Sequence, residues 1–260
     1  VQITAAERQR LSRRYTRNLE AYDYFLRAKA AFLMREPAEN QAAQRMYRKA
    51  IELDPAFARA YAGLALAHTD DYRNQWATDG QAALSRANEL AQTALRMDTE
   101  LPEVYAVRAY VHVVRLQYDE AIKLLRRAIT LAPSYGDGYA YLGAVYTHMG
   151  RPVDAIPMLR MAMRLNPDAG FIYFVVLGRA YLFLGDIEQA MINLREALAR
   201  NPTDLEARVF MAATLVAAGD LGSRGGSYAQ AWLRGAPMVA NAPDDERRSK
   251  AAIDQLARAS

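Results

Sequence analysis

The chain has 260 residues, of which 52% are hydrophobic, and its formal net charge is +4 at pH 7. This apolar fraction can bury a continuous core and argues against a disordered chain. The absence of cysteine excludes disulfides and thiolate metal sites. The first residues are polar, so no signal peptide is expected, and the apolar runs are too short to predict a membrane span.

The amino-terminal part predicts two helices. Residues 4–17 form the first, a short amphipathic helix in which Thr4 and Glu7 have the spacing of a capping box. Asn18 is predicted to break it. Residues 22–34 then form the first helix of a degenerate opening repeat, followed by a long turn at residues 35–40.

From there the dipeptide Asp-Pro or Asn-Pro recurs at the ends of helical runs, at Asp54-Pro55, Asn166-Pro167 and Asn201-Pro202. An aromatic or long side chain opens the next helix, and these anchors lie 44, 34, 35 and 34 residues apart. The value 44 is one period plus a ten-residue insertion around residues 70–76, which carries Trp76. The anchors are Tyr61, Tyr105, Tyr139, Phe174 and Arg208.

Small residues mark where the two helices of each repeat are expected to cross. The fourth residue after each anchor is Gly or Ala, and the second helix of each repeat carries Ala-x3-large-x2-Ala on one face. A glycine is expected to end the first helix at Gly150, Gly185 and Gly219. The second-helix sets are Ala43/Tyr47/Ala50, Ala87/Ala91/Ala94, Ala121/Leu125/Ala128, Ala155/Leu159/Ala162 and Ala190/Leu194/Ala197.

The carboxy-terminal part is less regular. Residues 221–227 are predicted to be a flexible linker, and Ala229/Leu233/Ala236 restores the second-helix pattern. Residues 244–260 are predicted to form a capping helix, because a terminal repeat must face water on one side.

A period of 34 residues with two helices per unit resembles the tetratricopeptide repeat (TPR) family. The resemblance implies an all-α, right-handed superhelical solenoid of about six helix-turn-helix units, with flanking helices. The expected organisation is a flanking helix at 1–18, a TPR array at 19–243 and the capping helix at 244–260. The units are expected at about 21–55, 56–99, 100–133, 134–167, 168–202 and 203–243.

The opening residues suggest a narrower resemblance. The segment 5–28, with Arg13-Arg14-Tyr15 and Ala21-Tyr22-Asp23-Tyr24-Phe25, is similar to the start of the carboxy-terminal repeat region of bacterial class III adenylate/guanylate cyclase-like proteins. Residues 56–65 and 176–181 share this similarity. It implies that the chain is a regulatory or docking region of a larger bacterial signalling protein. The chain does not begin with Met, and we expect it to be a piece of a longer protein.

No constellation in the sequence indicates catalysis, a cofactor or a metal. The three histidines lack the i,i+3 or i,i+4 spacing of a helical metal pair, and His68 and His112 fall on a repeat core position. Asp70-Asp71 lacks the alternating ligands of a calcium loop, and no serine or threonine has a base beside it. We therefore expect no catalytic, cofactor-binding or metal-binding residues, and a chain that is not itself an enzyme.

In the TPR architecture the first helices line a concave groove, and here the expected lining is apolar and aromatic. Such a surface suits a partner's helix, and the alternative is that a second copy of the chain or its own terminal helix covers it. Trp76 is either a seal over its own helix pair or a further contact. The groove residues chosen from their positions relative to the anchors are Arg59, Tyr110, Val114, Tyr141, His148, Val176, Arg179, Phe183 and Phe210.

The favoured function is a non-catalytic protein-protein interaction scaffold whose partner is a protein, a peptide or a second copy. Two alternatives stay open: a basic-surface nucleic-acid binder and a small-ligand sensor. The scattering of the 33 basic residues argues against nucleic acid, which requires a basic face. The cyclase-like resemblance implies a cytoplasmic location, with the periplasm left open.

Overall fold

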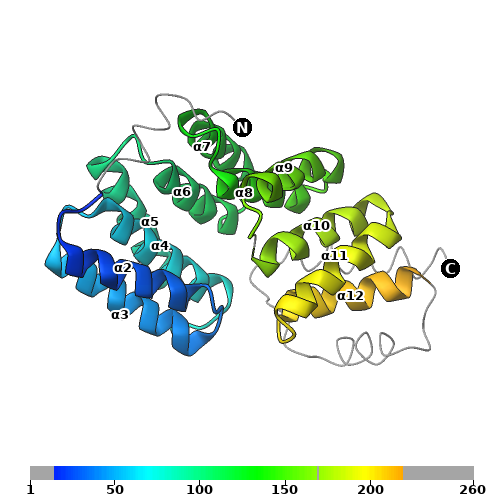
Figure 1. Cartoon of the computed structure of the whole chain (residues 1–260), viewed down its shortest axis with the longest axis horizontal. Helices are drawn as coiled ribbons and strands as arrows, with labels where there is room; N and C mark the ends of the chain where they lie inside the picture. The colour runs from blue at the N-terminus through cyan, green and yellow to red at the C-terminus, as the bar shows by residue number, and fades with distance from the viewer. Residues whose placement is uncertain (1–14, 169, 219–260) are drawn as a thin grey trace. The chain divides into compact units, whose positions relative to one another are not determined.

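The computed structural model describes residues 15–168 and 170–218. Within these ranges the chain forms eleven α-helices and no strand, which confirms the predicted all-α fold. Figure 1 labels them α2 (Leu19–Phe32), α3 (Pro37–Leu53), α4 (Ala58–Arg73), α5 (Gly80–Met97), α6 (Pro102–Val114), α7 (Tyr118–Leu131), α8 (Gly136–His148), α9 (Pro152–Leu165), α10 (Phe171–Leu184), α11 (Ile187–Arg200) and α12 (Leu205–Ala217).

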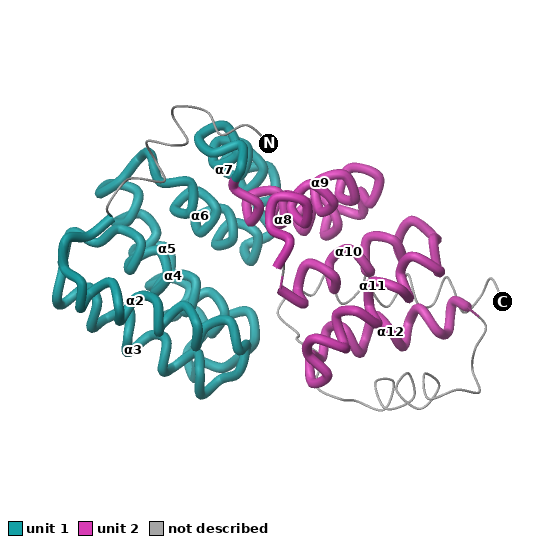
Figure 2. Tube along the Cα trace, in the orientation of Figure 1, with its two compact units in different colours: residues 1–134 teal, residues 135–260 magenta. Residues whose placement is uncertain are grey.

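Each repeat is a pair of sequential helices packed on one another. The pairs are α2 with α3, α4 with α5, α6 with α7, α8 with α9, and α10 with α11, and α12 packs on α10 and α11. The chain divides into two compact units, residues 1–134 and 135–260 (Figure 2). The predicted linker, the second helix of the last repeat and the capping helix all lie outside the described residues.

The recurrent Asp-Pro and Asn-Pro phrases end the second helices, as their spacing predicted. Asp54, Asn166 and Asn201 are the C-caps of α3, α9 and α11, and each is followed by proline. Proline disfavours the α conformation in the residue before it, so the helix stops there. Each cap still donates its backbone N–H to the last alanine of the Ala-x3-large-x2-Ala pattern, four residues earlier.

The turns inside the repeats share one backbone feature. Gly150 and Gly185, predicted to end their helices, have φ values of 67° and 85°. The corresponding turns of the first three repeats use Arg35, Gln75 and Leu116, which also have positive φ, between 56° and 60°. A side chain in this left-handed region costs about 1–2 kcal/mol relative to glycine. Gly219 lies outside the described residues.

The small residues of the repeat pattern allow close approach between the paired helices. A Cβ added at Gly143 would lie 2.6 Å from Cγ of Leu159, and one added at Gly178 would lie 2.6 Å from Cγ of Leu194. Both leucines are fully buried, as are all ten flanking alanines of the five second-helix sets. The predicted pattern of small and large residues is therefore the interior of each described helix pair.

The ten-residue insertion lengthens two helices as well as the turn between them. α4 and α5 have 16 and 18 residues, compared with 13 and 14 in α6 and α7. The insertion therefore adds about one turn to each helix, and a further three residues extend the connection. Trp76, in that connection, is half-buried.

The boundaries predicted near the amino terminus are wrong in two respects. Residues 15–18 are not helical, so the helix predicted at 4–17 does not reach its predicted end, and residues 4–14 lie outside the described part. Asn18 is the N-cap of α2, which begins at Leu19: its side-chain oxygen accepts a hydrogen bond from the backbone N–H of Ala21 at 3.0 Å. Residues 37–40, predicted to be part of a long turn, belong to α3. Proline at the first helical position explains the early start of α3.

Candidate protein-interaction surfaces

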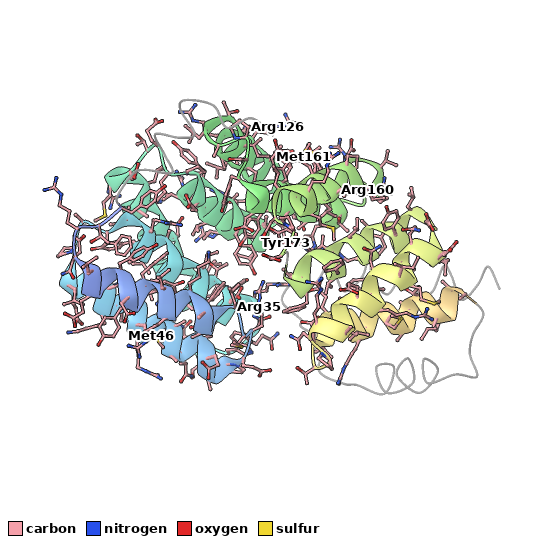
Figure 3. The ribbon with its side chains drawn as sticks, viewed as in Figure 1. Arg35, Met46, Arg126, Arg160, Met161 and Tyr173 are labelled. Atoms are coloured by element: carbon pink, nitrogen blue, oxygen red, sulfur yellow. The ribbon has the colours of Figure 1, made fainter. Side chains whose placement is uncertain are left out.

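A buried carboxylate joins the first three repeats. Asp70 on α4 is 1% exposed and accepts hydrogen bonds from Arg35 Nη1 at 2.5 Å and from the Tyr110 hydroxyl at 2.8 Å. Arg35 lies in the turn between α2 and α3 (Figure 3), and Tyr110 lies on α6. Burial raises the pKa of the Tyr110 phenol, and the negative charge of Asp70 raises it further. Tyr110, predicted to line the groove, thus forms part of a contact between repeats.

The neighbouring Asp71 has its own set of donors. Its two carboxylate oxygens accept hydrogen bonds from Asn40 Nδ2 at 2.7 Å and from Gln44 Nε2 at 2.6 Å, both on α3. His68 lies one turn before it on α4, with Nδ1 3.7 Å from the carboxylate, and burial lowers the pKa of its imidazole. Asp70 and Asp71 therefore connect repeats. The spacing of Asn40 and Gln44, one helical turn apart, is the sequence signal that could have indicated this contact.

Arg59 is the first of the predicted groove residues, and its guanidinium lies between aromatic rings and a carboxylate. It donates to Glu103 on α6 at 2.9 Å and lies over the rings of Tyr15 and Phe25, 4.5 and 5.2 Å from their centroids. The cation–π contacts hold Tyr15 and α2 against α4, and the ion pair joins α4 to α6. Val114 is partly buried beside Leu84.

In the second unit, the predicted groove residues from three first helices come together around Arg179. This α10 side chain is 6% exposed and donates through Nη1 to Glu206 on α12 at 2.8 Å. Its Nη2 lies 3.5 Å from Nε2 of His148 on α8, and its guanidinium lies over the Phe210 ring, 5.4 Å from the centroid. A cation held by a carboxylate and an aromatic face on neighbouring helices orders this surface.

An aromatic pair lies next to this cluster. Phe183 on α10 meets Phe210 on α12 edge to face, with ring centroids 6.2 Å apart, and Phe183 is 40% exposed. Tyr141 on α8 is half-buried. Tyr173 on α10, labelled in Figure 3, donates a hydrogen bond to Asp137 on α8. Burial raises the pKa of Tyr173, so its hydroxyl remains a donor.

The structure separates the predicted groove residues by accessibility. Val176 is only 8% exposed and Arg179 is slightly more buried, so little of either side chain can contact a partner. Phe183 is exposed, while Tyr141, His148 and Phe210 are half-buried. A binding role for these residues, and for Trp76, stays a prediction.

Several exposed apolar side chains of the first repeat were not predicted as binding residues. Leu19, Tyr22, Leu26 and Leu33 are all exposed on or at the end of α2. Tyr22, Leu26 and Leu33 lie within the helix predicted at 22–34 and are four and seven residues apart, a spacing that places them on one helix face. The predicted groove positions are defined relative to the anchors, which begin at Tyr61, so they do not include this helix.

The described residues provide neither a cluster of metal ligands nor a membrane-spanning helix. Among them, no group of three or more His, Cys, Asp or Glu side chains is placed to hold a metal ion. No helix in the described part of the chain is long and apolar enough to cross a bilayer.

Two family models match the chain, both described as tetratricopeptide repeat: one covers residues 117–174 and the other residues 173–215. The helix pairs within residues 117–215 are therefore tetratricopeptide repeats. The match begins at the turn before α7 and runs to α12, over helices whose pairing and small-residue contacts follow the repeat.

Known relatives of this chain include a Rhizobium meliloti (strain 1021) protein that carries the name of an adenylate cyclase, 32% identical over 121 residues. That match covers 46% of this chain and 21% of the relative. The small glutamine-rich tetratricopeptide repeat-containing protein 2 of Saccharomyces cerevisiae is 26% identical over 150 residues, which are 55% of this chain and 42% of that protein. The chain thus spans less than half the length of either relative.

Among solved structures, a thermophilic TPR protein of Thermus thermophilus superposes with a TM-score of 0.60 at 19% identity. The superposition covers 75% of this chain and 99% of that one. At this identity the likeness shows the fold, which is the TPR solenoid.

Proposed function

We propose that this TPR chain is a non-catalytic scaffold that binds an apolar or aromatic helical segment of a protein partner on the surface formed by α8, α10 and α12. The TPR fold supports a scaffold role. The observation that carries the finer proposal is the pair Phe183–Phe210, since an exposed phenylalanine backed by a second ring is a typical anchor for an apolar side chain.

The surroundings of the pair support this function. The Arg179–Glu206 ion pair is largely buried and joins α10 to α12, so the two aromatic residues are held on helices that already contact one another. A preorganised surface loses less conformational entropy on binding. A partner helix would place apolar residues at i, i+3 and i+4 on such a surface.

The relation to the cyclase-named protein supports a second proposal, that the chain is a regulatory or docking region of a larger signalling protein. The catalytic activity of such a parent would then reside outside this chain. The described residues support this division, because their most buried carboxylate, Asp70, is bonded to Arg35 and Tyr110 and is closed to substrate.

Nucleic acid is a less suitable partner. Many exposed cations pair with a carboxylate three or four residues away in the chain, as in Arg151–Asp154, Arg200–Glu196 and Lys123–Glu120. Such local pairing weakens the positive field that phosphate binding requires.

The test is selection of peptides from a displayed library of amphipathic helices against the 260-residue chain, followed by measurement of their affinities. We expect the selected peptides to bind the Phe183→Ala variant at least about tenfold more weakly, a loss of roughly 1.4 kcal/mol. Ile192→Ala is the matched control, because Ile192 is similarly exposed but lies on the second helix α11. Equal affinity of the selected peptides for wild type and Phe183→Ala would refute this surface.

A further inference from the structure

α2 is apolar on two opposite faces. Its inner face buries Ala21, Phe25, Ala28 and Ala31 against the rest of the first unit. Its outer face carries what we name the α2 stripe, which consists of Leu19, Tyr22, Leu26, Ala30 and Leu33 and is exposed throughout. A continuous exposed apolar stripe on a helix typically marks a site of interaction with a partner.

The geometry of the α2 stripe suits another helix. Its members are three or four residues apart, so they form one line along the helix, the arrangement that packs in a helix–helix seam. The line is about 21 Å long at 1.5 Å per residue. Leu19 is 85% exposed and Leu33 is 58% exposed, so both ends of the line are open to a partner.

We infer that the occupant of the α2 stripe is the α2 stripe of a second copy of this chain, packed antiparallel. The charges beside it favour this choice. Glu20, Asp23 and Arg27 follow one flank of the stripe at the same three- and four-residue spacing, with the acidic residues in the first half of the helix and the basic residue in the second.

An antiparallel pair brings the same flank of the two copies together, with the first half of one helix against the second half of the other. With Leu26 at the centre, Asp23 of each copy then lies near Arg27 of its partner copy. Within one helix, Arg27 Nη1 lies 3.6 Å from Asp23 Oδ2, and both side chains are highly exposed. The dimer would bring two such ion pairs together into a group of four charges. In a parallel pair this flank of one copy would instead face the opposite flank of the other, so the contact between Asp23 and Arg27 of different copies would not form.

The size of the stripe sets the strength of the contact. A single helix pair of this length buries less than the roughly 1,200 Å² that stable complexes need. We therefore expect a dimer that forms and dissociates with protein concentration, with a dissociation constant on the order of 100 µM. This inference is independent of the function proposed for α8, α10 and α12.

Light scattering over a concentration series is the first test. We expect the mass of the wild-type chain to rise toward that of a dimer, and the Leu26→Glu variant to stay monomeric because it places a charge at the centre of the seam. Ile192→Glu is the matched control, an exposed apolar residue on α11 that should leave the dimer unchanged. A wild-type chain that remains monomeric at about 1 mM, or a dimer that survives Leu26→Glu, would overturn the inference.

The orientation can be tested with single cysteines, since the native sequence contains none. An antiparallel pair centred on Leu26 places residue 19 of one copy opposite residue 33 of the other. An equimolar mixture of Leu19→Cys and Leu33→Cys chains should therefore form a mixed disulfide under mild oxidation, while Leu19→Cys alone should not. Cross-linking of Leu19→Cys with itself would show a parallel pair and contradict the proposed arrangement.

Discussion

The Tyr110 hydroxyl on α6 donates a 2.8 Å hydrogen bond to the buried Asp70 carboxylate on α4, across the boundary between two repeats. In the first unit, a residue predicted to line the groove is thus engaged in a polar contact between two helices of its own chain. A carboxylate this buried requires its donors, because an unpaired charge in the interior is strongly destabilising.

Tyr110→Phe should therefore lower the free energy of unfolding by about 2 kcal/mol, the typical contribution of a hydrogen bond to a charged group. Urea denaturation followed by circular dichroism measures this change. Tyr105→Phe is the control on the same helix: Tyr105 donates to the Thr99 carbonyl at an exposed site, and its loss should cost much less. Equal costs for the two variants would show that the Asp70 contact adds little.

Gly178→Ala should destabilise the second unit. The new Cβ would lie 2.6 Å from Cγ of the fully buried Leu194, so α10 and α11 must move apart or Leu194 must leave its rotamer. Overpacking of this kind costs about 1–3 kcal/mol. Gly170→Ala, where nothing lies within 4 Å of the new Cβ, should cost much less in the same thermal-unfolding measurement.

A double-mutant cycle separates this crowding from the loss of glycine itself. Leu194→Ala removes the atoms that the new Cβ would meet, so Gly178→Ala should cost less in that background than in wild type. Additive costs would mean that the two side chains do not compete for space.

Leu116→Gly should stabilise the chain by about 1 kcal/mol. Leu116 has a φ of 60° and occupies the turn position that glycine holds at 150 and 185. Arg115→Gly, one residue earlier at a φ of −92°, relieves no such strain and should give no gain. A melting temperature that falls for Leu116→Gly would show that the exposed leucine contributes more by contact than it costs in backbone strain.

His68 should make stability depend on pH. Burial lowers its pKa in the folded state, so the unfolded chain binds a proton more readily. The free energy of unfolding should consequently fall as the pH is lowered from about 6.5, the usual histidine value, toward the lowered pKa of the folded state. Urea titrations of wild type and His68→Gln across this window should show a weaker dependence in the variant. An unchanged slope would assign the effect to other groups.

From α4 onward, the described helices, their pairing and their contacts inside each repeat were predictable from the sequence alone. This succeeded because these features depend on local rules. Proline stops a helix before it, glycine adopts a positive φ, and the Ala-x3-Leu-x2-Ala pattern places three side chains on one face, as Leu159 and Leu194 show.

Which residues remain accessible on the first helices could be read only from the packed structure. Val176 and Phe183 both occupy predicted groove positions, yet one is buried and the other exposed. Asp70 and Asp71 appear in the sequence as an acidic pair without a role, but their donors are distant in the chain. Asn40 lies 31 residues before Asp71, Arg35 lies 35 residues before Asp70, and Tyr110 lies on α6. Accessibility and hydrogen-bond partners depend on which repeats lie next to each other in space, and a repeat pattern fixes only what each repeat does within itself.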